Sequence, residues 1–184
     1  MKSLVLLCLA ALASATASAQ SAGFLCCNMR TDGSWISDIN YLGPSKTVIS
    51  AGTRLTINGY GKNRVHVEIN GRQQDIGNDY SRSLSLEAFA KRYVVEQDPL
   101  LRLKNYPKRI QEAIGTARLS MGMNREQVIM AVGYPVADEN PSLESTTWRY
   151  WLSSFAEFDA IFDDKGLLIK VEATPEVRAR VIAQ

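Results

Sequence analysis

The spacing of hydrophobic residues along this chain changes near residue 85. Before that point, short runs alternate apolar and polar residues. The clearest run is 64–76, where Val65, Val67 and Ile69 alternate with polar side chains. Asn70 and Gly71 follow, and both residue types accept the positive φ of a type I′ turn. The pattern predicts a β-hairpin at 64–76, and the other short strands around it predict a small barrel or sandwich.

After residue 85 the apolar residues recur with helical spacing. Leu86, Phe89 and Tyr93 fall on one stripe, which predicts a helix with Ser85 or Ser83 as a suitable N-cap. Pro99 and Pro107 are placed to begin two further helices, because proline is well tolerated in the first helical turn.

Both ends of a fourth helix can be recognised from the sequence. Asn124 and Gln127 have the spacing of a capping box, and an apolar run at 128–132 follows them. Gly133 is placed to end the helix with a positive φ, and Pro135 prevents the helix from resuming. We therefore expect a short, well-delimited helix between Asn124 and Gly133.

The last part of the chain returns to strand-like alternation. Residues 147–152, 158–162 and 167–171 predict three antiparallel strands, with a tight turn at 163–166 between the last two. Trp148 should face the helices, whereas Trp151 should face away from them. The buried face is expected to carry Trp148, Phe158, Phe162 and Ile169.

The first nineteen residues have the pattern of a secretory signal peptide of bacterial type. Lys2 supplies the positive charge, residues 4–12 form a short apolar run, and Ala17-Ser18-Ala19 is a cleavage site. The run is too short to cross a bilayer, which requires ~20 apolar residues. We expect cleavage before Gln20, a periplasmic location with association to the outer membrane left open, and no transmembrane segment in the mature chain.

The charge of the mature chain argues against a nucleic-acid partner. The chain keeps 20 basic and 19 acidic residues after cleavage, which gives a net charge of +1. Nucleic-acid binding requires a concentrated basic field, and this composition does not supply one.

Two cysteines, Cys26 and Cys27, remain once Cys8 has left with the signal peptide. Ordinary disulfides join residues whose Cα atoms are ~5.5 Å apart, so a bridge between neighbours closes a strained ring. We expect two small buried hydrophobic residues on a first strand. An intermolecular bridge or a redox pair is the alternative interpretation.

No group of residues has the pattern of a reactive centre. His66 is the only histidine, and it alternates outward from the apolar positions of the hairpin, so it offers no basis for a triad or a multi-histidine metal site. Glu157 and Asp159 alternate with Phe158 and should lie in solvent. We therefore expect no enzyme activity, no catalytic residue, no metal and no cofactor.

Five residues are candidates for a binding surface. Tryptophan and arginine outside a core are typical of binding hot spots, although another layer of structure covering that face is an equal alternative. Aromatic residues in a long loop or at a helix end can line a groove, or can instead pack the loop or act as a hinge. The candidates are Trp151, Arg149, Tyr134, Trp35 and Tyr41.

Residues 117–171 carry several fixed spacings that are similar to those of a known family. The chain resembles the SmpA/OmlA (BamE-like) family, whose fold is shared with β-lactamase-inhibitor-type modules, while residues 40–53 resemble bacterial SH3-like barrels. The spacings are Gly122-Met123-x-Arg125-Glu126-Gln127-Val128, Gly133-x-Pro135, Trp148-x-Tyr150 and Phe162-Asp163-x-x-Gly166. The resemblance implies non-catalytic binding of envelope proteins, among them the outer-membrane assembly machinery. This chain differs from the assembly lipoproteins by having no suitable lipid-modified cysteine and by its additional β domain.

The expected fold class is therefore α+β. A small all-β, SH3-like barrel is expected to precede a BamE-like unit of two helices and a three-stranded antiparallel sheet. The expected divisions are a signal peptide (1–19), the SH3-like domain (20–83), connecting helices (84–106), the BamE-like domain (107–173) and a C-terminal tail (174–184). The expected function is that of an exported, non-enzymatic envelope protein that binds protein partners, in outer-membrane assembly or envelope maintenance. The alternative is a β-lactamase-inhibitor-type or peptidoglycan- or peptide-binding module.

Overall fold

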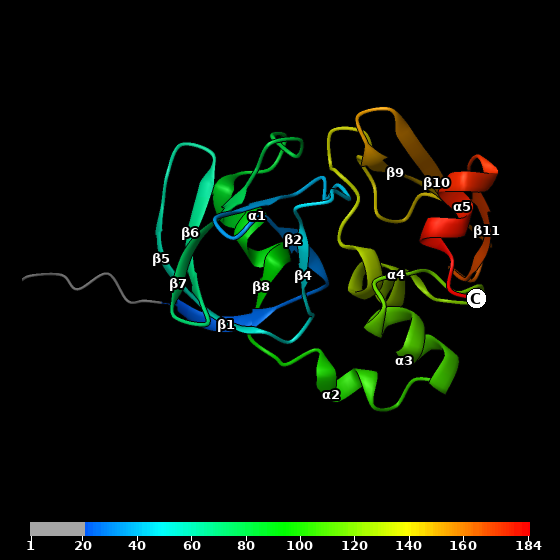
Figure 1. Ribbon diagram of the computed structural model, residues 1–184, viewed down its shortest axis with the longest axis horizontal. Helices are drawn as coiled ribbons and strands as arrows, with labels where there is room; N and C mark the ends of the chain where they lie inside the picture. Colours follow the sequence, from blue (N-terminus) through cyan, green and yellow to red (C-terminus); the bar gives the residue numbers. More distant parts are fainter. Residues whose placement is uncertain (1–20) are drawn as a thin grey trace, which may run out of the picture.

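The computed structural model describes residues 21–184, so the expected signal peptide lies outside the described residues. The described chain is mostly β, with two separate sheets and five short helices (Figure 1). The larger sheet lies in the first half of the chain and the smaller one near its C-terminal end.

The larger sheet is built from eight strands. They are, in chain order, β1 (Ser21–Leu25), β2 (Met29–Thr31), β3 (Trp35–Ser37), β4 (Thr47–Ile49), β5 (Arg54–Tyr60), β6 (Arg64–Ile69), β7 (Arg72–Gly77) and β8 (Val94–Val95). Their order across the sheet is β4-β2-β3-β7-β6-β5-β1-β8. Neighbouring strands are antiparallel except β3 and β7, which are parallel. The sheet curls into a half-barrel with β4 and β8 at its edges (Figure 1).

The hairpin predicted at 64–76 is confirmed. Strands β6 and β7 pair in antiparallel register, with Val65 opposite Ile76. Asn70 and Gly71 join them with φ values of 52° and 72°, as a type I′ turn requires.

The first helix, α1 (Leu86–Tyr93), packs into the curl of the larger sheet. Ser85 caps it by accepting a hydrogen bond from the N–H of Ala88. Phe89 and Tyr93 are buried together with Leu25 and other side chains of the sheet. The helix therefore belongs to the core of the first unit, and the sheet continues after it into β8.

The remaining helices and the smaller sheet form the second unit. Its sheet is antiparallel in the order β11-β10-β9, and its core combines Trp148 with side chains of three helices. The elements are α2 (Leu100–Leu103), which leads in from the first unit, α3 (Lys108–Gly115), α4 (Arg125–Val132), β9 (Thr147–Ser153), β10 (Ala156–Phe162), β11 (Leu168–Glu172) and α5 (Pro175–Val181). The capping box of Asn124 and Gln127 is confirmed, and Gly133 follows α4 with a φ of 89°.

The expected fold class is wrong. The first unit is an eight-stranded half-barrel filled by α1, where an SH3-like barrel was expected, and the second unit is not a two-helix BamE-like module. The helix α5 occupies the stretch expected to be a tail, and it buries Val177 and Val181 in the core of the second unit. Sequence periodicity predicts where elements begin and end, but the partners of β1, β3 and β8 lie far away in the chain.

The facing of the last strand is also corrected. Ile169 was expected in the core but is 57% exposed, whereas Leu168 and Val171 are buried. The register between β10 and β11 shifts beside Phe162. A shift of one residue turns the side chains of a strand to the opposite face, so simple alternation assigned Ile169 to the wrong side.

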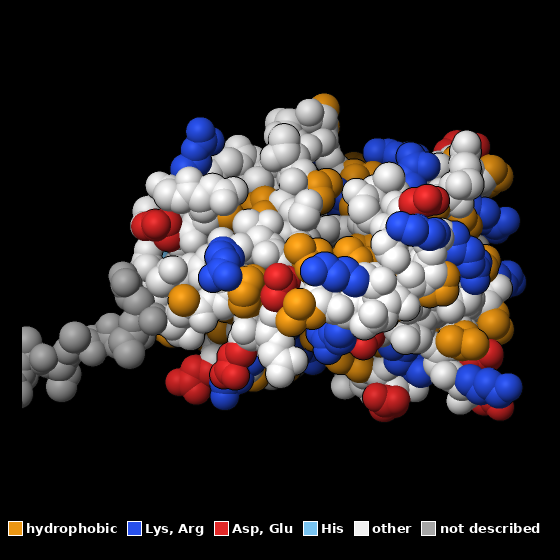
Figure 2. Space-filling model, turned by 90° about the horizontal axis from the view of Figure 1, so that it is seen from below, with side chains coloured by type: hydrophobic (Ala, Val, Ile, Leu, Met, Phe, Trp, Pro, Cys, Tyr) orange, Lys and Arg blue, Asp and Glu red, His pale blue; other side chains and the backbone are white. Residues whose placement is uncertain are grey.

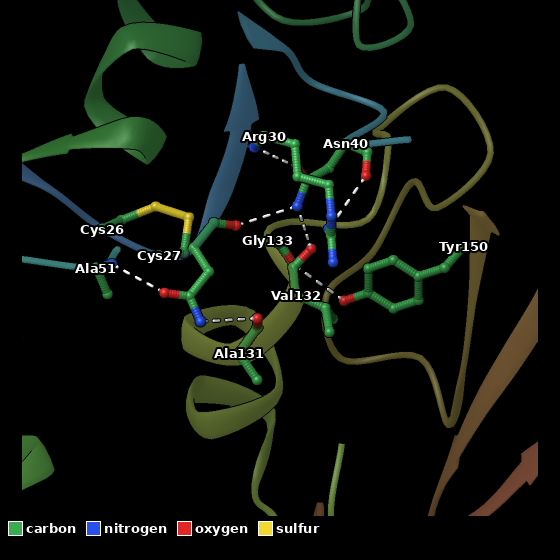
Figure 3. Close-up of a disulfide and its surroundings, with 10 residues drawn as sticks. Cys26, Cys27, Arg30, Asn40, Ala51, Ala131, Val132, Gly133 and Tyr150 are labelled. Atoms are coloured by element: carbon green, nitrogen blue, oxygen red, sulfur yellow. Dashed lines mark hydrogen bonds between the residues drawn. A yellow bond between two sulfur atoms is a disulfide. The ribbon is translucent and has the colours of Figure 1, made fainter. Parts of the chain in front are cut away.

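Cys26 and Cys27 are buried as expected, but they do not remain as two separate thiols. A disulfide joins these neighbouring residues directly after β1 (Figure 3). The expectation that a strained ring disfavours such a bridge was therefore wrong for this pair.

Candidate functional site

Two buried asparagines of the first unit hold the end of α4. The amide nitrogen of Asn28 donates to the carbonyl oxygens of Ile114 (2.6 Å) and Ala131 (3.1 Å). The amide nitrogen of Asn40 donates to Val132 (2.8 Å). The last carbonyl groups of a helix have no partner within the helix, so these amides provide the missing donors (Figure 3).

Further contacts join the two units at the same place. The Leu42 N–H donates to the Leu152 carbonyl (3.0 Å), and the Asn28 N–H donates to the Met130 carbonyl (3.0 Å). Within the second unit, the Tyr150 hydroxyl donates to the Gly133 carbonyl (3.2 Å). We call this contact around Asn28, Asn40 and the end of α4 the seam. Because buried hydrogen bonds are costly to break, the seam fixes how the two units face each other.

The fixed arrangement brings two of the predicted binding residues together. Trp35 and Tyr41 line one surface cavity of about 480 Å³, and Tyr80 lines it with them. The Tyr41 and Tyr80 rings lie 6.4 Å apart at an angle of 47°, within the range in which aromatic rings interact favourably. Lys46 and Arg82 also line this cavity, together with Asp79, which pairs with Arg64.

Trp35 owes its position to its neighbours on β6 and β7. The Arg64 guanidinium lies 3.9 Å from the centroid of the Trp35 ring, and it also pairs with Asp79 at 3.1 Å. Gly77 pairs with Ser37 in the sheet, and a Cβ atom at that position would collide with the Trp35 indole ring. The indole is therefore held between a cation and a glycine, and it presents its remaining surface to the cavity.

Tyr80 is positioned by a buried carboxylate. Asp38 is 1% exposed and accepts hydrogen bonds from the backbone N–H groups of Asp79 (3.2 Å) and Tyr80 (3.0 Å). Burial raises the pKa of Asp38 to about 6, while these N–H donors and the Ser81 hydroxyl act to lower it. The protonation state of Asp38 therefore changes the strength of the hydrogen bonds that hold the loop carrying Tyr80.

Trp151 and Arg149 are not part of this cavity, and Trp151 lines a different one together with Asn40 and Arg180. The Trp151 Nε1–H donates to Glu139 (2.8 Å). Tyr41 lies close to the same carboxylate, and Ser154 is its side-chain hydrogen-bond partner; burial raises the pKa of Tyr41, and the charge of Glu139 raises it further. Arg149 pairs with Asp159 at 3.1 Å across β9 and β10, and this pairing raises its pKa.

The hairpin between β9 and β10 carries an exposed aromatic residue directly after Ser154, the hydrogen-bond partner of Tyr41. Phe155 follows Ser154 and is 99% exposed, and Tyr80 is 44% exposed. We call Trp35, Tyr41, Tyr80 and Phe155 the aromatic face. Large exposed apolar side chains that gather on one surface are typical of interaction sites.

Tyr134 lies elsewhere, in a second cavity at the seam. Its ring packs edge-on against Tyr93 at 5.7 Å, and Arg92 lies 5.3 Å from its centroid. Burial raises the pKa of the Tyr134 hydroxyl. Of the five predicted residues, Trp35 and Tyr41 share a cavity, whereas Trp151, Arg149 and Tyr134 lie outside it.

Sequence reasoning missed several residues of these sites. Tyr80 stands in a polar segment that reads as a turn, and Phe155 stands in a hairpin tip without a recognisable motif. Asn28 gives no sequence signal, because only the packing of the two units reveals its carbonyl partners. Asn40 has a positive φ of 55°, which is enriched in asparagine but is not readable from the residue type alone.

The described residues contain no group of three or more His, Cys, Asp or Glu side chains that would hold a metal ion. His66 pairs with Asp75 at 2.6 Å across the β6–β7 hairpin, where it is partly exposed. Within residues 21–184, no helix has the length and apolar character needed to span a membrane.

Comparisons of this chain with protein-family models, with curated proteins and with solved structures found no match.

Proposed function

We propose that this chain is an exported, non-enzymatic protein of the bacterial cell envelope that binds protein partners through its aromatic face. The observation that carries the proposal is the shared cavity of Trp35, Tyr41 and Tyr80, together with the exposed Phe155, which follows Ser154, a hydrogen-bond partner of Tyr41. Aromatic residues supply most of the binding energy in many protein interfaces. Such a face supports binding and needs no reactive group.

The chemistry of the face favours a particular kind of partner segment. Trp35 and Phe155 offer apolar surface, while Lys46 and Arg82 line the cavity. A partner that inserts an apolar side chain and carries an acidic residue next to it would complement both features. Electrostatic complementarity of this kind steers association and fixes orientation.

The surface charge supports a protein partner over nucleic acid. In Figure 2, which views the molecule from the underside of Figure 1, basic, acidic and hydrophobic side chains are interspersed. No broad basic field covers this face, whereas nucleic-acid binding depends on one.

Export is the part of the proposal that depends on residues 1–19. In a bacterial host, the protein released by osmotic shock should begin at Gln20 when its N-terminus is measured by mass spectrometry. Retention of the uncleaved chain in the cytoplasm would remove the envelope from the proposal.

Binding through the aromatic face is tested by photo-crosslinking in cells. A photoreactive amino acid replaces Phe155 in one chain and Ile169 in a control chain, since both positions are exposed but Ile169 lies on β11. We expect discrete protein adducts from position 155 and none from position 169. Equal labelling at both positions would contradict the proposal, and adducts with peptidoglycan alone would assign the face to a different class of ligand.

A further inference from the structure

A second cavity, of about 290 Å³, lies between the two units and is separate from the aromatic face. Its inner wall is mainly apolar and contains residues of both units. The residues important here are Cys26, Ile129, Met130, Tyr134, Arg125 and Trp148. We call it the seam cavity. Cavities of this size and character, with a few convergent polar groups, are typical of small-molecule sites.

Two hydrogen-bond donors in the wall of this cavity lack a partner. Trp148 is 0% exposed, and its Nε1–H makes no hydrogen bond with any residue of the described chain. The Nε–H of Arg125 is likewise buried without a partner. Leaving a buried donor unpaired is costly, and most buried polar groups in proteins are satisfied. Both groups can only donate, so the ligand they fit is an acceptor.

Arg125 also gives the inner part of the cavity a positive charge. Its NH₂ group donates to the backbone carbonyls of Glu144 (3.0 Å) and Ser145 (3.1 Å), and within residues 21–184 it forms no ion pair. Its guanidinium carbon lies 6.0 Å from the centroid of the Trp148 ring and 5.0 Å from that of Phe162. A cation held against aromatic rings without a carboxylate favours an anionic acceptor.

The mouth of the cavity carries one arginine and two glutamates, so its charges cancel only together with that of Arg125. Arg102 and Glu126 pair at 2.8 Å, and both are exposed. Glu144, also exposed, stands in the loop that carries Leu143. The Trp148 N–H is closed to water in this structure, so binding of an acceptor there requires the exposed loop to shift outward. The inner wall at Cys26 stays neutral, since a bridged cysteine has no thiol proton to lose.

We propose that the seam cavity binds a small amphipathic carboxylate, with its carboxylate on Arg125 and the Trp148 indole N–H and its apolar body against Cys26, Ile129 and Met130. This site goes beyond the proposed protein-binding function and does not depend on it. If the seam cavity proves not to bind a carboxylate, the proposal that the aromatic face binds a protein is unaffected.

Octanoate is the probe, and octylammonium is a control of equal chain length and opposite charge. The chain has three tryptophans, so a ¹⁵N-labelled sample gives three indole N–H resonances, which single Trp→Phe variants assign. Octanoate should shift the Trp148 resonance and leave those of Trp35 and Trp151 in place. Octylammonium should bind at least about tenfold more weakly, because it cannot accept from the two donors.

Variants separate this site from a general effect on folding. Trp148→Phe keeps an aromatic ring but removes the N–H, and it should lower octanoate affinity about tenfold. Arg125→Gln should lower it by at least as much, whereas Trp151→Phe should leave it unchanged. The far-ultraviolet spectrum of each variant checks that the chain is folded.

Three outcomes would overturn the proposal. One is no shift of the Trp148 resonance with octanoate up to about 1 mM, which corresponds to the weakest affinity of interest. Another is equal or tighter binding of octylammonium. The third is an octanoate affinity that Trp148→Phe and Trp151→Phe change to the same extent.

Discussion

Gly77 shows how a single residue shapes the aromatic face. The Trp35 indole lies directly over Gly77, and the carboxylate of Asp79 is close to the same point. No other residue type leaves this space free. The binding surface therefore depends on a glycine that makes no contact with any partner.

Replacing Gly77 with Ala should destabilise the chain and displace Trp35. Overpacking of this kind typically costs about 1–3 kcal/mol, and the displaced indole should change the Trp35 fluorescence. Gly115→Ala is the matched control, since nothing lies within 4 Å of a Cβ there, and alanine in a helix should stabilise by about 0.5–1 kcal/mol. Urea unfolding of both variants measures the difference, and equal effects of the two substitutions would contradict this placement of Trp35.

Asp38 should make stability depend on pH. Burial raises its pKa to about 6 from an ordinary value of 3.8. The folded chain therefore holds the proton more tightly than the unfolded chain does. The resulting stabilisation is complete below about pH 4 and is lost as the pH rises through the folded pKa.

The wild-type chain should lose roughly 3 kcal/mol of unfolding free energy between about pH 4 and pH 7 that the Asp38→Asn variant does not lose. Urea titrations at constant ionic strength measure this difference between the two chains. Parallel pH profiles for wild type and variant would show that Asp38 does not titrate with a raised pKa.

At the scale of elements, the end of α4 is stabilised from outside its own segment. Its capping box is local and was predicted from Asn124 and Gln127. The carbonyl groups at its other end depend on Asn28 and Asn40, which precede it by about ninety residues or more. Both ends of the helix are thus predicted from sequence, by the capping box and by Gly133, but the donors to its last carbonyl groups come from tertiary contacts.

Asn28→Ala should cost about 3 kcal/mol or more. The substitution leaves the carbonyls of Ile114 and Ala131 and the N–H of Ala51 without their Asn28 partner, and each unsatisfied buried group costs about 1–3 kcal/mol. Asn105→Ala provides a control at an exposed position and should change stability by no more than about 0.5 kcal/mol. Chemical denaturation distinguishes the two cases, and similar losses at both sites would remove the structural role assigned to Asn28.

The elements also show what the sequence could and could not predict. Hairpin 64–76, the helix caps and the inward facing of Trp148 follow from local spacing, and the structure confirms them. The parallel pairing of β3 with β7 and the addition of β8 to β1 are non-local, so no window of sequence contains them. The same limit applied to the sites: Trp35 and Tyr41 were predicted as aromatic loop residues, whereas Tyr80 joins them only through the fold.

At the scale of the whole molecule, the seam should make the two units unfold together. The side-chain amides of Asn28 and Asn40 and the backbone N–H of Leu42 connect the two units. Separate units joined by a flexible linker would unfold independently. Here the loss of either unit exposes buried polar groups of the other.

The test uses two variants, one in which Trp35 is the only tryptophan and one in which Trp151 is the only tryptophan. Both variants should unfold in a single transition. In each chain, tryptophan fluorescence and circular dichroism should give coincident unfolding transitions, which is the test of a two-state process. In the Asn28→Ala, Asn40→Ala double variant the transitions should separate. Separate transitions in the chains that retain both asparagines would show that the seam does not couple the units.

The central claim is that this molecule acts by binding a protein through its aromatic face. The most direct measurement is the affinity of the partner crosslinked at position 155 for purified wild type and for Phe155→Ser, Tyr80→Ser and Ile169→Ser. The first two substitutions should weaken binding about tenfold or more, as expected for aromatic hot spots, and Ile169→Ser should leave it unchanged. Equal affinities for all four chains would contradict the claim.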